Sequence, residues 1–164
     1  MKRQVVTFQV GQQWLGVDIL LVREINRQLE CTPVQLAPTH FIGLSNLRGQ
    51  VVTIIDLARR LHQHHRSEDG KCHDIVLKGE QELATLRVRE KRPDLMTSND
   101  LVGLRVDAIG DIVEVEAEQI EPVPANLAEI DAKYVSGIVS VSCGLVLLLD
   151  TKGVLDGQEG IRPQ

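Results

Sequence analysis

Short apolar stretches separated by turn residues dominate the chain. Residues 5–10 alternate between apolar and polar side chains, whereas residues 51–55 and 145–149 are short runs of β-branched or aliphatic residues. Alternation, and runs of this length, are typical of β-strands rather than helices. A glycine lies where each run meets the apolar stretch before it, so residues 44–55 and 138–149 each predict a β-hairpin. The pattern therefore predicts an all-β protein.

The apolar pattern occurs twice along the chain. Residues 15–25 align with residues 102–112, and residues 43–56 align with residues 137–150. An internal repeat indicates that each half forms a similar unit. Each half has too few short strands for a stable flat sheet, and closure removes exposed edge strands. The repeat thus predicts two small closed or nearly closed β-barrels that pack against each other.

An aspartate follows each predicted hairpin. Aspartate is a preferred N-cap residue, because its side chain accepts a hydrogen bond from the first free backbone N–H groups of a helix. Asp56 and Asp150 therefore predict short helices over residues 57–62 and 151–155.

Composition narrows the protein class. The 164 residues are 43% hydrophobic but only 2% aromatic, so any core must be aliphatic. The three cysteines, Cys31, Cys72 and Cys143, are irregularly spaced and odd in number, which favours a reducing cytoplasm over a secreted disulfide framework. No long apolar run follows the N-terminus, so neither a signal peptide nor insertion into a membrane is expected.

Charge is unevenly distributed. The net charge is −5. Residues 1–99 contain 14 Lys and Arg against 11 Asp and Glu, whereas residues 100–164 contain 4 against 12. The two halves are therefore expected to present different electrostatic surfaces.

Two charged residues are candidates for contact with a partner. Arg48 lies in a predicted hairpin loop whose counterpart, residues 140–144, has no cation, so the loop itself does not require arginine. It is either a solvated turn residue or an anchor for a partner, since arginine is enriched at interface hot spots. Glu24 is a second candidate, although its counterpart Asp111 leaves a shared structural role equally open.

Catalytic and metal-binding chemistry is not indicated. Histidines and a cysteine in residues 62–65 and 72–73 have zinc-ligand chemistry, but their spacing matches no closed zinc pattern and a polar loop is the simpler interpretation. Neither a nucleophile elbow, a phosphate-binding loop nor a paired-carboxylate motif frames the nucleophilic residues. We expect no enzyme activity, metal or cofactor.

Nucleic-acid binding is also not expected. The chain is acidic, and its four aromatic residues are scattered rather than arranged as a stacking surface. The one basic cluster lies in residues 87–92, where Arg87 and Arg89 alternate with apolar residues. That alternation predicts the solvated face of a strand.

Two blocks of the sequence resemble motifs of a known family. Residues 8–19 contain Phe-Gln-Val-Gly and Leu-Gly-Val-Asp-Ile, and residues 43–57 contain Gly-Leu-Ser-Asn-Leu-Arg-Gly followed by an apolar strand and Asp-Leu. Both blocks resemble the CheW-type chemotaxis coupling proteins. The likeness extends from about residue 5 to about residue 155.

The resemblance implies a fold and a set of partners. It implies one CheW-like domain over residues 1–155, with two SH3-like five-stranded barrels and a tail at residues 156–164. The first barrel is expected at about residues 15–60 plus closing strands, and the second at about residues 75–150. It also implies a non-enzymatic cytoplasmic adaptor that joins the cytoplasmic tip of a chemoreceptor to the regulatory domain of a CheA-type histidine kinase.

Position by position, the resemblance implies four partner-binding residues. Val22 and Glu24 match the family's Val-x-Glu strand, and Gly43 and Arg48 match its Gly-x-x-Asn-Leu-Arg-Gly segment. Two other functions remain open: an adaptor of a signalling array that serves surface motility, and a barrel that senses a ligand or metal through the His/Cys loop.

One segment departs from the family pattern. About twenty residues, roughly 82–100, replace a tight hairpin between two predicted strands. Within this insertion, residues 83–89 predict an extension of a strand, and residues 92–100 predict a mobile loop.

Overall fold

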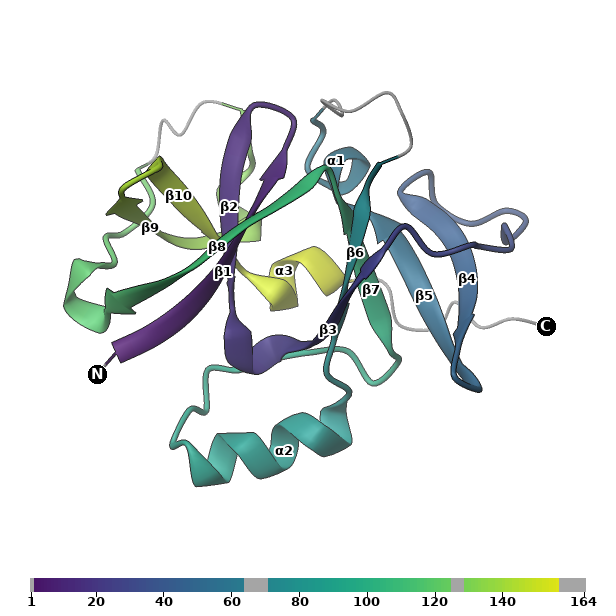
Figure 1. Ribbon diagram of the computed structural model, residues 1–164, viewed down its shortest axis with the longest axis horizontal. Helices are drawn as coiled ribbons and strands as arrows, with labels where there is room; N and C mark the ends of the chain where they lie inside the picture. The colour runs from purple at the N-terminus through teal and green to yellow at the C-terminus, as the bar shows by residue number, and fades with distance from the viewer. Residues whose placement is uncertain (1, 64–70, 125–128, 157–164) are drawn as a thin grey trace.

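The fold is described from a computed structural model, which covers residues 2–63, 71–124 and 129–156 (Figure 1). Within these residues the strands form two five-stranded sheets, called here the first and second barrel. The strands of the first barrel, in order across the sheet, are β3 (Val22–Arg27), β6 (His73–Leu77), β7 (Val102–Val106), β5 (Gln50–Asp56) and β4 (Phe41–Leu47). Those of the second are β8 (Ala108–Glu116), β1 (Lys2–Val10), β2 (Gln13–Asp18), β10 (Gly144–Leu149) and β9 (Val135–Val141). The α-helices are α1 (Leu57–Arg60), α2 (Glu80–Arg89) and α3 (Thr151–Leu155), and the 3₁₀ turns are η1 (Ile19–Leu21), η2 (Ala117–Gln119) and η3 (Ala132–Tyr134).

The chain passes between the barrels twice. It leaves the second barrel after β2 and enters the first at β3, and it returns between β7 and β8. β2 pairs in parallel with β10, and β7 pairs in parallel with β5, so the repeated segments occupy equivalent places. β6 and β7 lie largely within the range expected for the second barrel, about residues 75–150, but they are strands of the first barrel. The strands of the first barrel therefore follow one another in the sequence from β3 to β7, whereas the second barrel combines β1 and β2 with β8, β9 and β10.

Each sheet closes on itself through a two-residue bridge. In the first barrel, the Thr32 amide donates to the Leu44 carbonyl at 2.8 Å, and the Leu44 amide donates back at 2.9 Å. In the second barrel, Glu121 and Ile138 exchange the equivalent bonds at 2.8 and 2.9 Å. These bridges join the segment after one edge strand to the opposite edge strand. The prediction of two five-stranded barrels is confirmed.

Three apolar clusters hold the barrels together. One fills each barrel, and the third and largest, called here the seam, lies between them and takes side chains from both. The seam is largely aliphatic, as the composition predicts. Its larger buried members include Phe8, Leu15, Leu21, Ile55, Leu57, Ile75, Leu83, Leu86, Leu95, Leu104, Leu147, Leu149 and Leu155.

The hairpins and their helix caps are confirmed. β4 pairs with β5 and β9 pairs with β10, with glycines of positive φ at the turns. The Asp56 carboxylate accepts from the Arg59 amide at 3.3 Å, and the Asp150 carboxylate accepts from the Gly153 amide at 3.2 Å. Each aspartate thus caps the helix that follows it, although α1 ends at Arg60, two residues earlier than predicted.

The predicted strand in the insertion is wrong, because that segment forms α2 (Figure 1). Leu83 and Leu86, three residues apart, lie on one face of the helix and are buried in the seam. Acidic residues occupy the first turn and Arg87 and Arg89 the last, which suits the helix dipole. The apparent alternation was misleading, since Val88 is 81% exposed.

The segment after α2 has no helix or strand, as expected, but it is not loose. Arg92 and Leu95 are only 6% and 2% exposed, and Ser98 is buried as well. The insertion as a whole packs beneath the two barrels and closes one end of the seam (Figure 1). The prediction of a mobile loop is therefore corrected.

Candidate partner-binding site

The first barrel brings Glu24 and Arg48 together. Glu24 lies on β3, and Arg48 lies in the turn between β4 and β5 with a left-handed φ of +52°. The Asn46 side chain supports this turn by accepting from the Gly49 amide at 2.9 Å. From this turn the Arg48 guanidinium forms an ion pair with the Glu24 carboxylate. The sequence interpretation proposed both residues as candidates, and the fold makes them partners.

The ion pair is open to solvent on the arginine side. The Arg48 side chain is 68% exposed, whereas that of Glu24 is 21% exposed. The Asn26 amide donates to Glu24 at 2.8 Å, and this bond, together with Arg48, holds the pKa of Glu24 below its usual value. Glu24 is therefore charged at neutral pH. Because exposed ion pairs contribute only about 0–1 kcal/mol to stability, the fold does not depend on Arg48.

Val22 and Gly43 lie in less accessible places. Val22 begins β3, where the pairing with β6 shifts register, and its side chain packs against the seam. Gly43 lies where the barrel closes, and a Cβ atom there would be 2.3 Å from the carbonyl oxygen of Thr32. Its counterpart Gly137 faces the other closing bridge, where a Cβ atom would be 3.1 Å from the Glu121 carbonyl oxygen. The need for glycine at position 43 thus has a structural explanation that is independent of any partner.

Four exposed apolar residues were missed by the sequence interpretation. Ile25 on β3 is 38% exposed, and Ile112, the residue aligned with it, is 55% exposed. Val51 on β5 is 54% exposed, and its aligned residue Leu145 is 56% exposed. The repeat places the members of each pair at equivalent positions, but it does not show that they are exposed. The two barrels therefore expose apolar side chains at equivalent positions.

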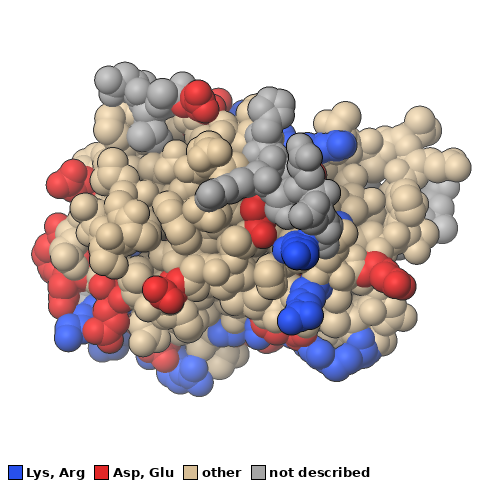
Figure 2. All heavy atoms as spheres, turned by 45° about the horizontal axis from the view of Figure 1, so that its top comes forward, with Lys and Arg blue, Asp and Glu red and all other residues tan. Residues whose placement is uncertain are grey.

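Charge is unevenly distributed over the surface, as the sequence predicts. Figure 2 shows mostly acidic side chains on the left, the side of β8 and β9, and basic side chains along the lower edge toward the right. A broad area between them carries neither sign.

The structure offers no support for a metal site within the residues it describes. No group of three or more His, Cys, Asp or Glu side chains there is arranged to hold an ion. Two of the histidines considered, His64 and His65, lie outside the described residues. Burial raises the pKa of the Cys72 thiol, which disfavours the thiolate that a zinc ion binds. No helix in the described part of the chain is long and apolar enough to cross a membrane.

The fold and the exposed charged and apolar residues define a double-barrel module with surfaces suited to protein partners. Residues 4–159 match the family model of the CheW-like domain, and the chain belongs to that family. It is 29% identical over 157 residues to the chemotaxis protein CheW of Rhizobium meliloti, covering 96% of this chain and 90% of the relative.

Two further comparisons agree. The chain is 29% identical over 157 residues to the chemotaxis protein CheW of Treponema pallidum, covering 95% of this chain and 84% of the relative. Its fold is similar to the crystal structure of the scaffolding protein TtCheW from Thermoanaerobacter tengcongensis, with a TM-score of 0.77 at 22% identity, covering 95% of this chain and 89% of that one.

Proposed function

We propose that this chain is a non-enzymatic adaptor that couples a chemoreceptor to a CheA-type histidine kinase. Its partners are the cytoplasmic tip of the receptor and the regulatory domain of the kinase. The adaptor works in the cytoplasm and is recruited to receptor arrays at the membrane. Membership of the CheW-like family over nearly the whole chain carries this proposal.

The geometry of the first barrel supports partner binding near Glu24 and Arg48. Arg48 is held in a left-handed turn, faces solvent and contributes little to the fold. Arginine forks onto carboxylates and is enriched where partners meet. Exposed Val51 and Ile25 provide apolar area on the same barrel. Val22 and Gly43 take part more indirectly, by shaping β3 and the closure of the barrel.

Binding measurements on reconstituted components test the proposal. Titration calorimetry would measure the affinity of the full chain for the kinase regulatory domain and for a receptor-tip fragment from the same organism. Arg48→Glu removes the cation and repels Glu24, so we expect a loss of about tenfold or more in affinity for at least one partner. Arg89→Glu is the matched control, because the Arg89 side chain is 66% exposed and, among the described residues, its ion pair is with its neighbour Glu90.

Two outcomes would contradict these expectations. If the wild-type chain binds neither fragment, the adaptor function is wrong. If it binds both and Arg48→Glu binds them equally well, Arg48 does not belong to the site. Circular dichroism on each variant would show that the fold is retained.

A further inference from the structure

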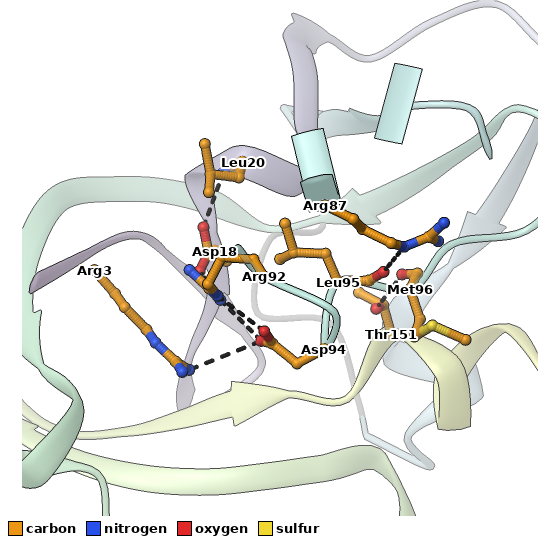
Figure 3. A network of polar contacts seen from close by, with 9 residues as sticks. All are labelled: Arg3, Asp18, Leu20, Arg87, Arg92, Asp94, Leu95, Met96 and Thr151. Carbon is orange, nitrogen blue, oxygen red and sulfur yellow. Dashed lines mark hydrogen bonds and ion pairs between the residues drawn. The ribbon is translucent and has the colours of Figure 1, made fainter. Parts of the chain in front are cut away.

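The insertion joins the two barrels. It leaves and re-enters the first barrel at β6 and β7, yet its polar contacts reach the second barrel (Figure 3). The Arg92 guanidinium donates to Asp18 at the end of β2 at 2.7 Å, and Asp94 lies 3.9 Å from the Arg3 guanidinium on β1. The Thr151 hydroxyl on α3 donates to the Met96 carbonyl at 2.7 Å. Each contact links the insertion to a different element of the second barrel.

Arg92 is the centre of this network. Its guanidinium donates through Nε and Nη2 to the two carboxylate oxygens of Asp94, each at 2.9 Å, and through Nη2 also to Asp18. Its side chain is only 7% exposed and that of Asp18 only 13%. Loss of one member of a buried ion pair leaves the other charge uncompensated and is strongly destabilising. The Arg92–Asp18 contact is therefore not a marginal surface pair.

Asp18 connects this network to the crossover between the barrels. Its second carboxylate oxygen accepts from the Leu20 amide at 2.9 Å and so caps η1. Leu21, the last residue of η1, is held as well, because the amide of Lys78, just before the insertion, donates to its carbonyl at 2.8 Å. β3 begins at the following residue, Val22. One carboxylate thus holds both the insertion and the turn that delivers β3.

We propose that the insertion is a brace between the two barrels and that Arg92 is its positioning residue. By holding Asp18, Arg92 fixes η1 and with it the start of β3. Contact between β3 and a partner rests on the function proposed above. If β3 makes that contact, the brace also positions Val22 and Glu24 for it. Buried Leu83, Leu86 and Leu95 keep the brace seated in the seam.

Amide hydrogen exchange on the full chain tests the brace without any partner. Arg92→Met keeps the length of the side chain but removes its charge and donors. We expect the Leu20 and Lys78 amides to exchange about tenfold or more faster than in the wild type, after normalisation to amides of the β9–β10 hairpin. Arg89→Met is the matched control on the same insertion and should leave both amides unchanged. If Arg92→Met does not fold, the milder Arg92→Lys, which keeps the charge but loses the fork, should show a smaller change in the same direction.

The results separate the brace from the proposed function. Equal exchange at Leu20 and Lys78 in the wild type and the Arg92 variants, relative to the hairpin, would overturn the brace whatever the partners do. Affinities for the kinase and receptor fragments form the second measurement. If Arg92→Met binds a partner more weakly than Arg89→Met does, the result supports the role of the brace in positioning the partner surface. Equal affinities together with faster exchange at Leu20 and Lys78 would overturn that positioning role. If the wild type binds neither fragment, the adaptor function fails while the exchange result still decides the brace.

Discussion

Gly43→Ala separates a structural from a partner-binding role for Gly43. A Cβ atom at this position would be 2.3 Å from the Thr32 carbonyl oxygen and 2.7 Å from its carbonyl carbon. Main-chain atoms cannot turn away as the end of a side chain can, so the closing bridge between Thr32 and Leu44 must shift or break. We therefore expect Gly43→Ala to lower the free energy of unfolding.

The size of the effect follows from the overlap. Forcing one extra carbon into a well-packed site typically costs about 1–3 kcal/mol. Because the overlap is with backbone, and the two hydrogen bonds of the bridge are at stake, a cost near the upper end, about 3 kcal/mol, is expected. For a domain of this size each kcal/mol lowers Tm by about 2–4 °C, so Tm should fall by about 6–12 °C.

Urea unfolding and thermal scans followed by circular dichroism would measure this loss. Gly137→Ala is the matched variant in the second barrel. There the nearest atom, at 2.6 Å, belongs to the Ile120 side chain, and the Glu121 carbonyl oxygen lies at 3.1 Å, so a smaller loss is expected. If Gly43→Ala is as stable as the wild type but binds a partner more weakly, the structural reasoning is refuted and Gly43 belongs to the binding surface. Equal affinity at a temperature where the variant is folded would support the reasoning.

Three further predictions concern charged and thiol groups. Arg105→Met should cost about 3–5 kcal/mol in urea unfolding, because it leaves fully buried Asp74, which now accepts from Arg105 at 2.9 and 3.0 Å, without its cation. The hydrogen bond from a buried arginine holds the pKa of Asp94 below its usual value. The contribution of the ionised Asp94 to folding stability is therefore present above the ordinary aspartate pKa and is lost as pH falls through the lower pKa of the folded state. The difference in unfolding free energy between wild type and Asp94→Asn should thus be constant above about pH 5 and shrink below about pH 4. Burial raises the pKa of the Cys31 thiol while Cys143 is exposed, so mass spectrometry after brief treatment with a maleimide at pH 7 should find Cys143 modified first.

The sequence predicts local structure well because the signals are local. Gly49 and Gly144 lie at turns with positive φ, and Asp56 and Asp150 cap the helices that follow. Each of these roles depends on a few neighbouring residues. The repeat extends this reach and identifies two similar barrels without any knowledge of the contacts between them.

The errors lie where distant parts of the chain meet. The assignment of strands to barrels depends on two crossovers that no local pattern records. In the insertion, alternation around Val88 concealed the spacing of Leu83 and Leu86, which suits a helix that buries one face. Arg92 lies in a polar stretch that is typical of a loop, and its ion pair with Asp18, a residue distant in the sequence, is not recorded by any local pattern.

The candidate site shows the same division. Comparison of the repeats singled out Arg48, because the equivalent loop needs no cation. Their alignment did not predict that Arg48 would contact Glu24, since that contact requires closure of the barrel around β3. Alignment of the halves places the exposed residues Val51 and Leu145 at equivalent positions, but it does so for buried apolar pairs such as Ile55 and Leu149 as well. What sequence alone cannot supply is burial, which distinguishes an apolar core position from an exposed one.

The two barrels solve one structural problem in different ways, and the difference explains why the insertion matters. Asp18 at the end of β2 and Arg105 at the end of β7 are aligned in the repeat. Arg105 finds its counter-ion within its own barrel, where Asp74 on the neighbouring strand accepts two hydrogen bonds from it. Asp18 takes its cation, Arg92, from the insertion, which belongs to the other barrel. An ion pair that stays within one barrel thus corresponds, at the equivalent position, to a link between the barrels. Removal of the insertion would therefore leave Asp18 without its cation while the ion pair of Arg105 stayed intact.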